Sequence, residues 1–89
     1  MNNIKNNLRE YRLKAGLRQV DVASLIGLDF ADRLSRWENG QAMPNVVNLF
    51  HLAAIYKVTP KDLYQDLRRN IDEQAQAAHS DALIRRMSH

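Results

Sequence analysis

The side chains that could carry out chemistry in this chain are histidines, serines and arginines, since it has no cysteine. The histidines stand singly without the spacing of metal ligands, and they are His51, His79 and His89. The serines have no histidine and carboxylate placed with them for nucleophilic catalysis, and they are Ser24, Ser35, Ser80 and Ser88. The three glycines form no loop that could cradle a phosphate. The sequence therefore predicts a protein that is not an enzyme and that has neither a metal site nor a cofactor.

The basic side chains remain, and they could bind an anionic partner. The 89 residues have a net charge of +3, but residues 1–18 are +4 and residues 19–40 are −2. A basic surplus at the beginning of the chain is compatible with a polyanion such as nucleic acid, although plain solubility is the more common reason for surplus charge. Composition alone therefore leaves the partner open.

Length and composition predict one small soluble domain. Apolar residues make up 45% of the chain and aromatic residues only 7%, which is enough for one lean core. The first residues form no apolar signal segment, and no apolar run approaches the length that spans a membrane. We expect a cytoplasmic protein with no membrane partner.

Glycines divide the first two thirds of the chain into short blocks with helical spacing. Apolar residues recur three and four apart within these blocks, in the sets Ile4, Leu8 and Tyr11, then Val22, Ala23 and Ile26, then Leu34 and Trp37. A fourth helix is expected after Asn45, a good N-cap, and a fifth after Thr59, with Pro60 at its first position. No segment alternates with period two, so the predicted fold is all-α.

Helices this short are marginal on their own, so their stability must come from packing against one another. We therefore predict a compact five-helix domain over residues 4–66. Its centre is expected to hold the apolar side chains of Leu25, Leu34, Trp37, Leu49, Leu52 and Leu63.

Residues 67–89 form a tail with a different pattern. Apolar or small residues recur there at helical spacing, but the stripe is too shallow and alanine-rich for a strong coiled-coil seam: Leu67, Ile71, Ala75, Ala78 and Ala82. Ser80 and Asp81 offer a fresh N-cap ahead of Leu83, so a restarted short helix is one alternative. We expect the tail either to extend as a helix that packs on a partner or to be a frayed end.

Two short helices separated by a glycine-containing turn, at about residues 19–38, are what a helix-turn-helix needs. At this point the sequence resembles the Cro and phage-repressor type helix-turn-helix family, the Xre-like class. The matching elements in order are Leu8 and Arg9, Gly16 and Leu17, Gln19, Ala23, Gly27, residues 35–40, Pro44 and residues 58–63. The resemblance covers residues 4–66.

The resemblance implies a domain whose third helix enters the major groove of double-stranded DNA while its second helix crosses the backbone. Gln19 corresponds to a phosphate-contacting glutamine of the family, and Arg18 stands where a cap and phosphate contact is usual. Asn39 matches another position that touches the backbone. Such contacts fix the register of a protein on DNA without reading its sequence.

Bases are expected to be read by the first turns and outer face of the third helix, that is by Ala31, Asp32, Arg33, Ser35 and Arg36. Arg36 is the first choice for guanine, because its planar fork fits the N7 and O6 acceptors, and Arg33 is the second. Asp32 either accepts from a cytosine amino group or serves only to cap the helix or to pair with one of these arginines. Ala31 is a candidate for contact with a thymine methyl group.

Four further residues are expected to have structural roles. Arg12 and Glu38 correspond to its ion pair between the first and third helices, which would fix the angle of the third helix. Leu34 and Trp37 lie three apart and are expected to face inward, so Trp37 is interpreted as a core residue and not as a platform for bases.

The sequence also departs from the family pattern. One extra residue lies between Gly27 and Trp37, so the turn is longer, and either Asp29 or Phe30 could stand at the N-cap of the third helix. Arg18 replaces the usual hydroxyl residue before Gln19. Lys57 replaces the usual glycine after the fourth helix, which costs about 1 kcal/mol if that site needs positive φ.

Taken together, these features predict a sequence-specific DNA-binding transcriptional regulator, most simply a repressor, acting as a homodimer on a two-fold operator. Two half-sites multiply the specificity of a helix that alone reads only a few base pairs. One alternative is an antitoxin that regulates itself through the same domain while the tail wraps a toxin. The other is a helix-turn-helix used only for protein interaction, with Asp29 and Asp32 spoiling the groove-facing surface.

Overall fold

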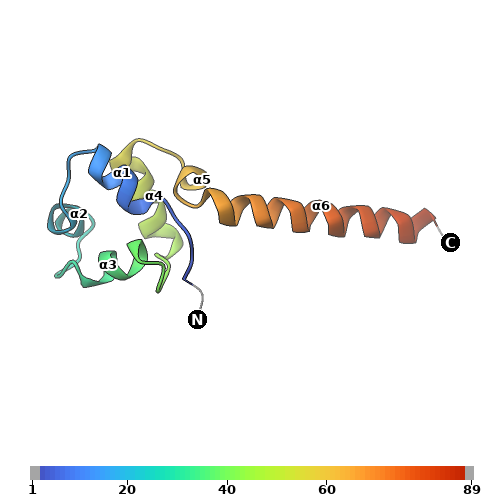
Figure 1. Cartoon of the computed structure of the whole chain (residues 1–89), viewed down its shortest axis with the longest axis horizontal. Coiled ribbons are helices and arrows are strands. Elements are labelled where there is room, and N and C mark those ends of the chain that lie inside the picture. The colour runs from blue at the N-terminus through green and yellow to red at the C-terminus, as the bar shows by residue number, and fades with distance from the viewer. Residues whose placement is uncertain (1–2, 88–89) are drawn as a thin grey trace.

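The computed structural model describes residues 3–87, which fold into six helices with no strand among them. The helices are α1 (Leu8–Lys14), α2 (Gln19–Leu25), α3 (Asp32–Glu38), α4 (Val46–Tyr56), α5 (Pro60–Leu63) and α6 (Gln65–Met87). The first five gather into one body, and α6 runs away from it as a single long rod (Figure 1). The predicted all-α fold, with a five-helix domain and a helical tail, is confirmed.

Helices α1 to α5 enclose one apolar core. Its buried members are Leu8, Val22, Leu34, Trp37, Leu52, Ala53, Tyr56, Leu63 and Tyr64. Of the predicted central residues four are buried, and Leu49 is partly buried against the same cluster. Leu25 was predicted wrongly, since 61% of it is exposed. Leu25 lies two residues beyond the buried Ala23, which turns its side chain to the opposite side of α2.

The predicted starts of α4 and α5 are confirmed by their cap geometry. The Asn45 side chain accepts the N–H of Asn48 at 2.8 Å. Thr59 and Asp62 form a reciprocal capping box, in which the Thr59 hydroxyl accepts the Asp62 N–H at 3.2 Å and the Asp62 carboxylate accepts the Thr59 N–H at 2.9 Å. These hydrogen bonds from Thr59, the backbone one first, lower the pKa of Asp62.

Helix α4 ends at a strained residue. Lys57 has φ 57° and ψ 43°, and it is the one non-glycine residue with positive φ in the described part of the chain. Its N–H closes the last turn of the helix on the carbonyl of Ala54 at 3.3 Å. This site therefore does need positive φ, and a residue with a Cβ occupies it.

The first helix begins later than the apolar spacing predicts. Ile4 lies outside α1, in a non-helical segment. The backbone N–H of Ile4 donates to the Gly40 carbonyl at 2.9 Å. The Asn6 side chain accepts the Leu8 N–H at 3.0 Å, so a side chain satisfies the start of the helix in place of a further turn. Ile4 still packs against the core, although it does so from this segment.

Helix α6 is continuous from Gln65 to Met87, so the predicted alternative of a restart at Ser80 is wrong. The chain between these ends contains neither glycine nor proline, and nothing interrupts its backbone ladder. The predicted domain boundary at residue 66 falls inside its first turn. Among the described helices, none combines the length and the apolar character needed to cross a membrane.

Candidate nucleic-acid interface

Helices α2 and α3 are joined by the turn of residues 26–31. Gly27 takes φ +80°, and the Leu28 N–H returns to the Ala23 carbonyl at 2.8 Å, which closes α2 with a left-handed cap. Helix α3 then buries Leu34 and Trp37 against the core. The opposite side of α3 is therefore left free for a partner.

The five residues predicted to read bases share the outward side and the first turns of α3. Asp32, Arg33 and Arg36 are exposed, while Ala31 and Ser35 are half-buried. The Arg33 guanidinium lies over the Trp37 ring at 5.8 Å from its centroid, a cation–π contact that draws this side chain along the helix. Arg36 takes part in no ion pair within residues 3–87, and neither does Asp32. Arg36 is thus the more available of the two arginines.

The start of α3 differs from both alternatives considered for it. Neither Asp29 nor Phe30 is the N-cap, because Ala31 occupies that position with φ −79° and ψ −3°. No side chain caps this end, since the methyl group of Ala31 cannot accept a hydrogen bond. The extra residue of the chain is absorbed in the turn, and Asp32 enters the first helical turn, where its charge suits the positive end of the helix.

Arg18 precedes α2 and is engaged with Asp21. Its Nε and Nη2 atoms donate to the Asp21 carboxylate at 3.1 and 3.0 Å, and its backbone N–H donates at 2.9 Å. These bonds, the side-chain ones first, lower the pKa of Asp21. A guanidinium has no acceptor, so Arg18 cannot cap a helix N–H as a hydroxyl would. A phosphate at this site would have to share Arg18 with Asp21.

Arg12, Glu38 and Gln19 form a network that joins three helices. Arg12 Nε and Nη2 donate to the Glu38 carboxylate at 2.6 and 3.1 Å, with the two side chains only 9% and 2% exposed. Gln19 Nε2 donates to the same carboxylate at 3.0 Å, and Arg12 Nη1 donates to the Leu17 carbonyl at 2.9 Å. The bond to Glu38 raises the pKa of Arg12. One N–H of the Gln19 amide is used inside the protein, which leaves the second for a phosphate.

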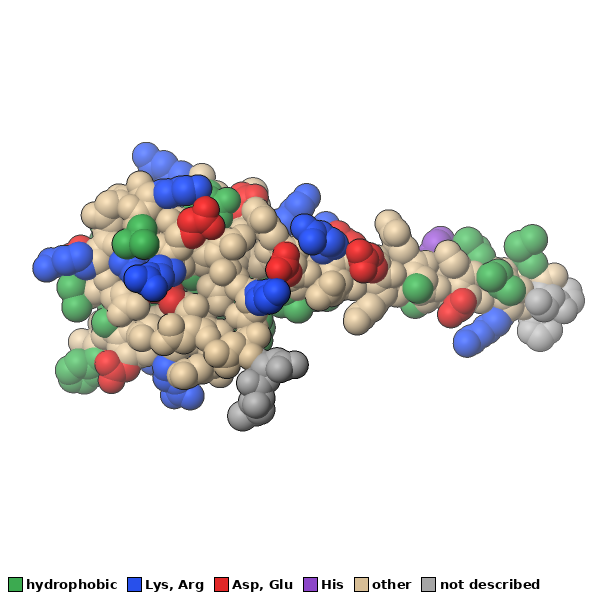
Figure 2. Space-filling model, viewed as in Figure 1, with side chains coloured by type: hydrophobic (Ala, Val, Ile, Leu, Met, Phe, Trp, Pro, Cys, Tyr) green, Lys and Arg blue, Asp and Glu red, His purple; other side chains and the backbone are tan. Residues whose placement is uncertain are grey.

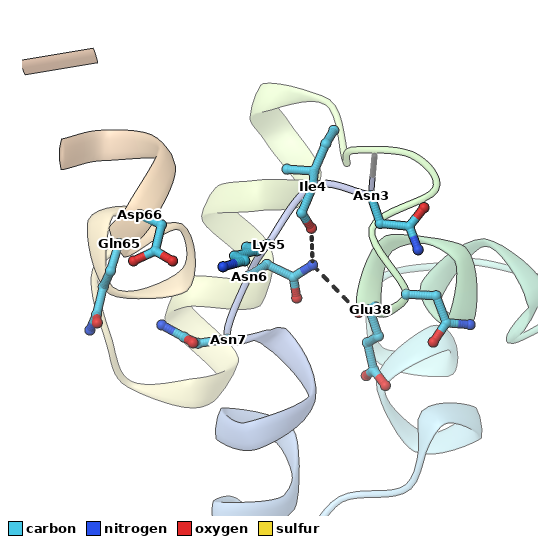
Figure 3. A pocket seen from close by; sticks show the side chains of 9 residues that line it. Asn3, Ile4, Lys5, Asn6, Asn7, Glu38, Gln65 and Asp66 are labelled. Carbon is cyan, nitrogen blue, oxygen red and sulfur yellow. Dashed lines mark hydrogen bonds between the residues drawn. The ribbon is translucent and has the colours of Figure 1, made fainter. Parts of the chain in front are cut away.

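Sequence reasoning missed the residue that holds the end of α3. Asn6 Nδ2 donates to the Trp37 carbonyl at 3.0 Å. It also donates to the carbonyls of Ile4 at 3.0 Å and Glu38 at 3.4 Å, and these two bonds are drawn in Figure 3. The N-terminal segment thereby lies across the end of α3, and together with Asn39 it lines a pocket there. Its approach requires Gly40, since a Cβ there would lie 2.5 Å from the Ile4 carbonyl oxygen. An asparagine two residues before the first helix is the only hint that the sequence offers.

Charge is mixed over the domain. On the face shown in Figure 2, basic and acidic side chains alternate over α1 to α5 without a continuous basic surface. Within residues 3–87, histidine, aspartate and glutamate form no cluster that could hold a metal ion. His89 and Ser88, which were weighed from the sequence, lie outside the described residues. On the face shown, bulk charge alone therefore does not mark a surface for an anionic partner.

Comparison with known proteins agrees with this geometry. No curated protein and no solved structure matches the chain. A family model described as helix-turn-helix matches residues 8–63, which is the whole span from the start of α1 to the end of α5. The chain therefore belongs to the Cro and phage-repressor type, Xre-like, helix-turn-helix family of DNA-binding regulators.

Proposed function

We propose that this protein is a sequence-specific transcriptional regulator, most simply a repressor, that acts by binding double-stranded DNA and not as an enzyme. The observation that carries the proposal is the exposure of Asp32, Arg33 and Arg36 on the outward side of α3, the second helix of the helix-turn-helix. These residue types match the donors and acceptors of the major groove.

In this proposal each part of the surface has a separate task. Arg36 forms the bidentate contact with guanine, and Asp32 accepts from a cytosine amino group. Arg33 reads a neighbouring base from its place over Trp37, while Ala31 and Ser35 make close contacts from their half-buried positions. The backbone is held by Arg18, Gln19 and Asn39.

The buried network beneath this surface sets the angle of α3. Glu38 is the last residue of α3, and its carboxylate is held by Arg12 of α1 and Gln19 of α2. The same Gln19 amide can bond a phosphate through its second N–H. We infer that Gln19 holds the DNA backbone in specific and non-specific complexes alike, while Arg12 keeps Glu38 in place.

A first experiment tests recognition itself. Fragments bound by the full chain are selected from random DNA, and the affinities for the selected and a scrambled duplex are compared by fluorescence anisotropy at several salt concentrations. A site-specific regulator prefers the selected duplex by about 1,000-fold or more, and a two-fold repeated half-site emerges from the selection. Equal affinities at low salt, where phosphate attraction is strongest, would contradict the proposal.

Helix α6 provides the surface for the proposed homodimer. None of its 23 residues is buried, although Leu67 packs against the core at its base. The stripe of Ile71, Ala75 and Ala78 is exposed along this helix. A long helix with an unburied apolar stripe gains stability by packing on another chain.

The dimer is tested with matched variants of the full chain in sedimentation velocity. Ala78→Glu places a charge on the stripe, whereas Gln76→Glu places the same charge on the opposite side of α6. We expect Ala78→Glu alone to shift the protein to monomer. A dimer that both variants leave intact would remove α6 from the interface.

The antitoxin alternative rests on the same exposed helix, with a second protein in place of a second copy. Purification of the native chain from its own cells separates the two. A stoichiometric second chain that is lost in Ala78→Glu and kept in Gln76→Glu would assign α6 to that partner.

A further inference from the structure

The α2–α3 turn carries an aromatic side chain that the proposed function leaves without a task. Phe30 is 75% exposed, more than any other aromatic side chain among residues 3–87. It immediately precedes Ala31, the N-cap of α3. The next most exposed aromatic residue, Phe50 on α4, is 58% exposed.

The surroundings of Phe30 place it with the base-reading residues. A shallow hollow in the surface is lined by Phe30 together with Asp32 and Arg33 of α3 and with Asp29 of the turn. The first turn of a recognition helix is the part that comes closest to base edges in the major groove. A ring that directly precedes this turn and shares a hollow with Asp32 and Arg33 therefore reaches the same groove.

The chemistry around the ring favours a base over the backbone. A phenyl ring offers no donor for a phosphate, and Asp29 and Asp32 beside it repel one. The apolar feature of the major groove is the 5-methyl group of a pyrimidine. Across a thymine–adenine pair the methyl group lies at one end, the thymine O4 acceptor comes next and the adenine amino donor follows. A phenyl ring can therefore contact the methyl group while a carboxylate beside it accepts from the adenine amino group.

We propose that Phe30 is a specificity-determining residue that contacts the 5-methyl group of a pyrimidine in each half-site. This inference rests on the proposed function and adds to it a preference that the arginines cannot supply. The extra residue in the turn is then useful, because it brings a ring to the entrance of the groove.

The test uses the full chain and variants of the selected duplex that each lack one methyl group. Each thymine is replaced in turn by deoxyuridine, which removes only the methyl group, and dissociation constants are measured by anisotropy. The wild-type chain should lose about fourfold in affinity at one thymine per half-site. Phe30→Ala should bind the thymine duplex more weakly than that, about 16-fold below the wild type, because a dimer loses the contact in both half-sites. It should also be indifferent to deoxyuridine at the same position.

A matched variant and a second base distinguish the remaining possibilities. Phe50→Ala removes the other exposed phenyl ring, which lies on α4, and should keep the full deoxyuridine effect. Deoxycytidine and 5-methyldeoxycytidine are then compared at the same position. If the wild type binds the 5-methyldeoxycytidine duplex more tightly than the deoxycytidine duplex, the methyl group of either pyrimidine makes the contact. If the two affinities are equal, the contact is confined to thymine.

Two results would overturn the inference while the regulator stands. One is specific DNA binding in which no thymine is sensitive to deoxyuridine, or in which Phe30→Ala keeps the sensitivity. The other is a Phe30→Ala variant that binds DNA as the wild type does but no longer retains a co-purified protein partner. Absence of any preference for the selected duplex would instead overturn the proposed function and this inference together.

Discussion

Helices α3 and α6 are held in place by opposite means. Helix α3 has seven residues, too few to be stable alone. It depends on the buried Leu34 and Trp37 and on the ion pair in which Arg12 donates to Glu38. Helix α6 has 23 residues and is supported by local surface pairs such as Arg68 with Asp72. Buried side chains therefore fix the short helix, whereas the long helix is held by its own turns and leaves its side chains unburied.

The largest expected difference between the two helices comes from truncating an apolar side chain in each. Trp37→Ala should lower the free energy of unfolding by about 3–5 kcal/mol, because it empties the centre of the core. Ile71→Ala in α6, where the side chain is 51% exposed, should change it by about 0.5 kcal/mol or less in the monomer. Urea unfolding followed by circular dichroism measures both, and similar losses would break the comparison.

The next difference concerns ion pairs. Glu38→Gln leaves the Arg12 guanidinium buried opposite a neutral amide and should cost about 3 kcal/mol. Asp72→Asn breaks the exposed pair with Arg68 and should cost between about 0 and 1 kcal/mol. The same unfolding measurement checks the two variants. If Glu38→Gln were as mild as Asp72→Asn, the network could not be what fixes α3.

A smaller effect, of opposite sign, is expected where the domain carries backbone strain. Lys57→Gly should stabilise the protein by about 1 kcal/mol, because glycine adopts φ 57° without the Cβ penalty. Lys57→Ala retains the Cβ and serves as the control, with no such gain expected. A rise in the denaturation midpoint for both variants would show that loss of the lysine side chain, not relief of φ, is responsible.

The smallest effect at neutral pH is expected at the junction of the domain with α6. Tyr64 lies there with its hydroxyl buried and without a hydrogen-bond partner within residues 3–87, and burial raises its pKa to about 12. Folding therefore favours the neutral phenol, so this contribution is intact below the unfolded value of about 10 and is lost as pH rises toward 12.

Tyr64→Phe removes the ionisable group and keeps the ring. Its stability at pH 7 should lie within about 0.5 kcal/mol of the wild type, and at pH 11 it should exceed that of the wild type. Denaturation at the two pH values compares them. Equal losses in both proteins between pH 7 and 11 would show that Tyr64 does not contribute to the alkaline instability.

How much the sequence could predict depended on the distance between interacting residues. The caps at Asn45 and Thr59 involve neighbours in the chain, and both were predicted correctly. The strain at Lys57 was predicted only on the condition that the site needs positive φ, and the structure meets that condition. The start of α3 was not, because two capping candidates competed and the turn absorbed the extra residue before Ala31.

Contacts of the site between residues far apart in the chain were harder to predict from the sequence. The Asn6 side chain donates to the Trp37 carbonyl, 31 residues away, and no local sequence pattern predicts that partner. Leu25 was assigned to the core because it is apolar, but it lies on the exposed side of α2. The contact of Arg12 with Glu38 was expected only through the family resemblance, and the structure forms it across 26 residues.

The most direct test of the account is the effect of Arg36→Ala on two duplexes. Affinities of the wild type, Arg36→Ala and Gln19→Ala are measured on the selected site and on a scrambled duplex at one salt concentration. Arg36→Ala should lose about 1–3 kcal/mol on the selected site and little on the scrambled one, while Gln19→Ala should weaken both alike. Equal loss on both duplexes for Arg36→Ala would contradict the claim that the exposed side of α3 reads DNA sequence.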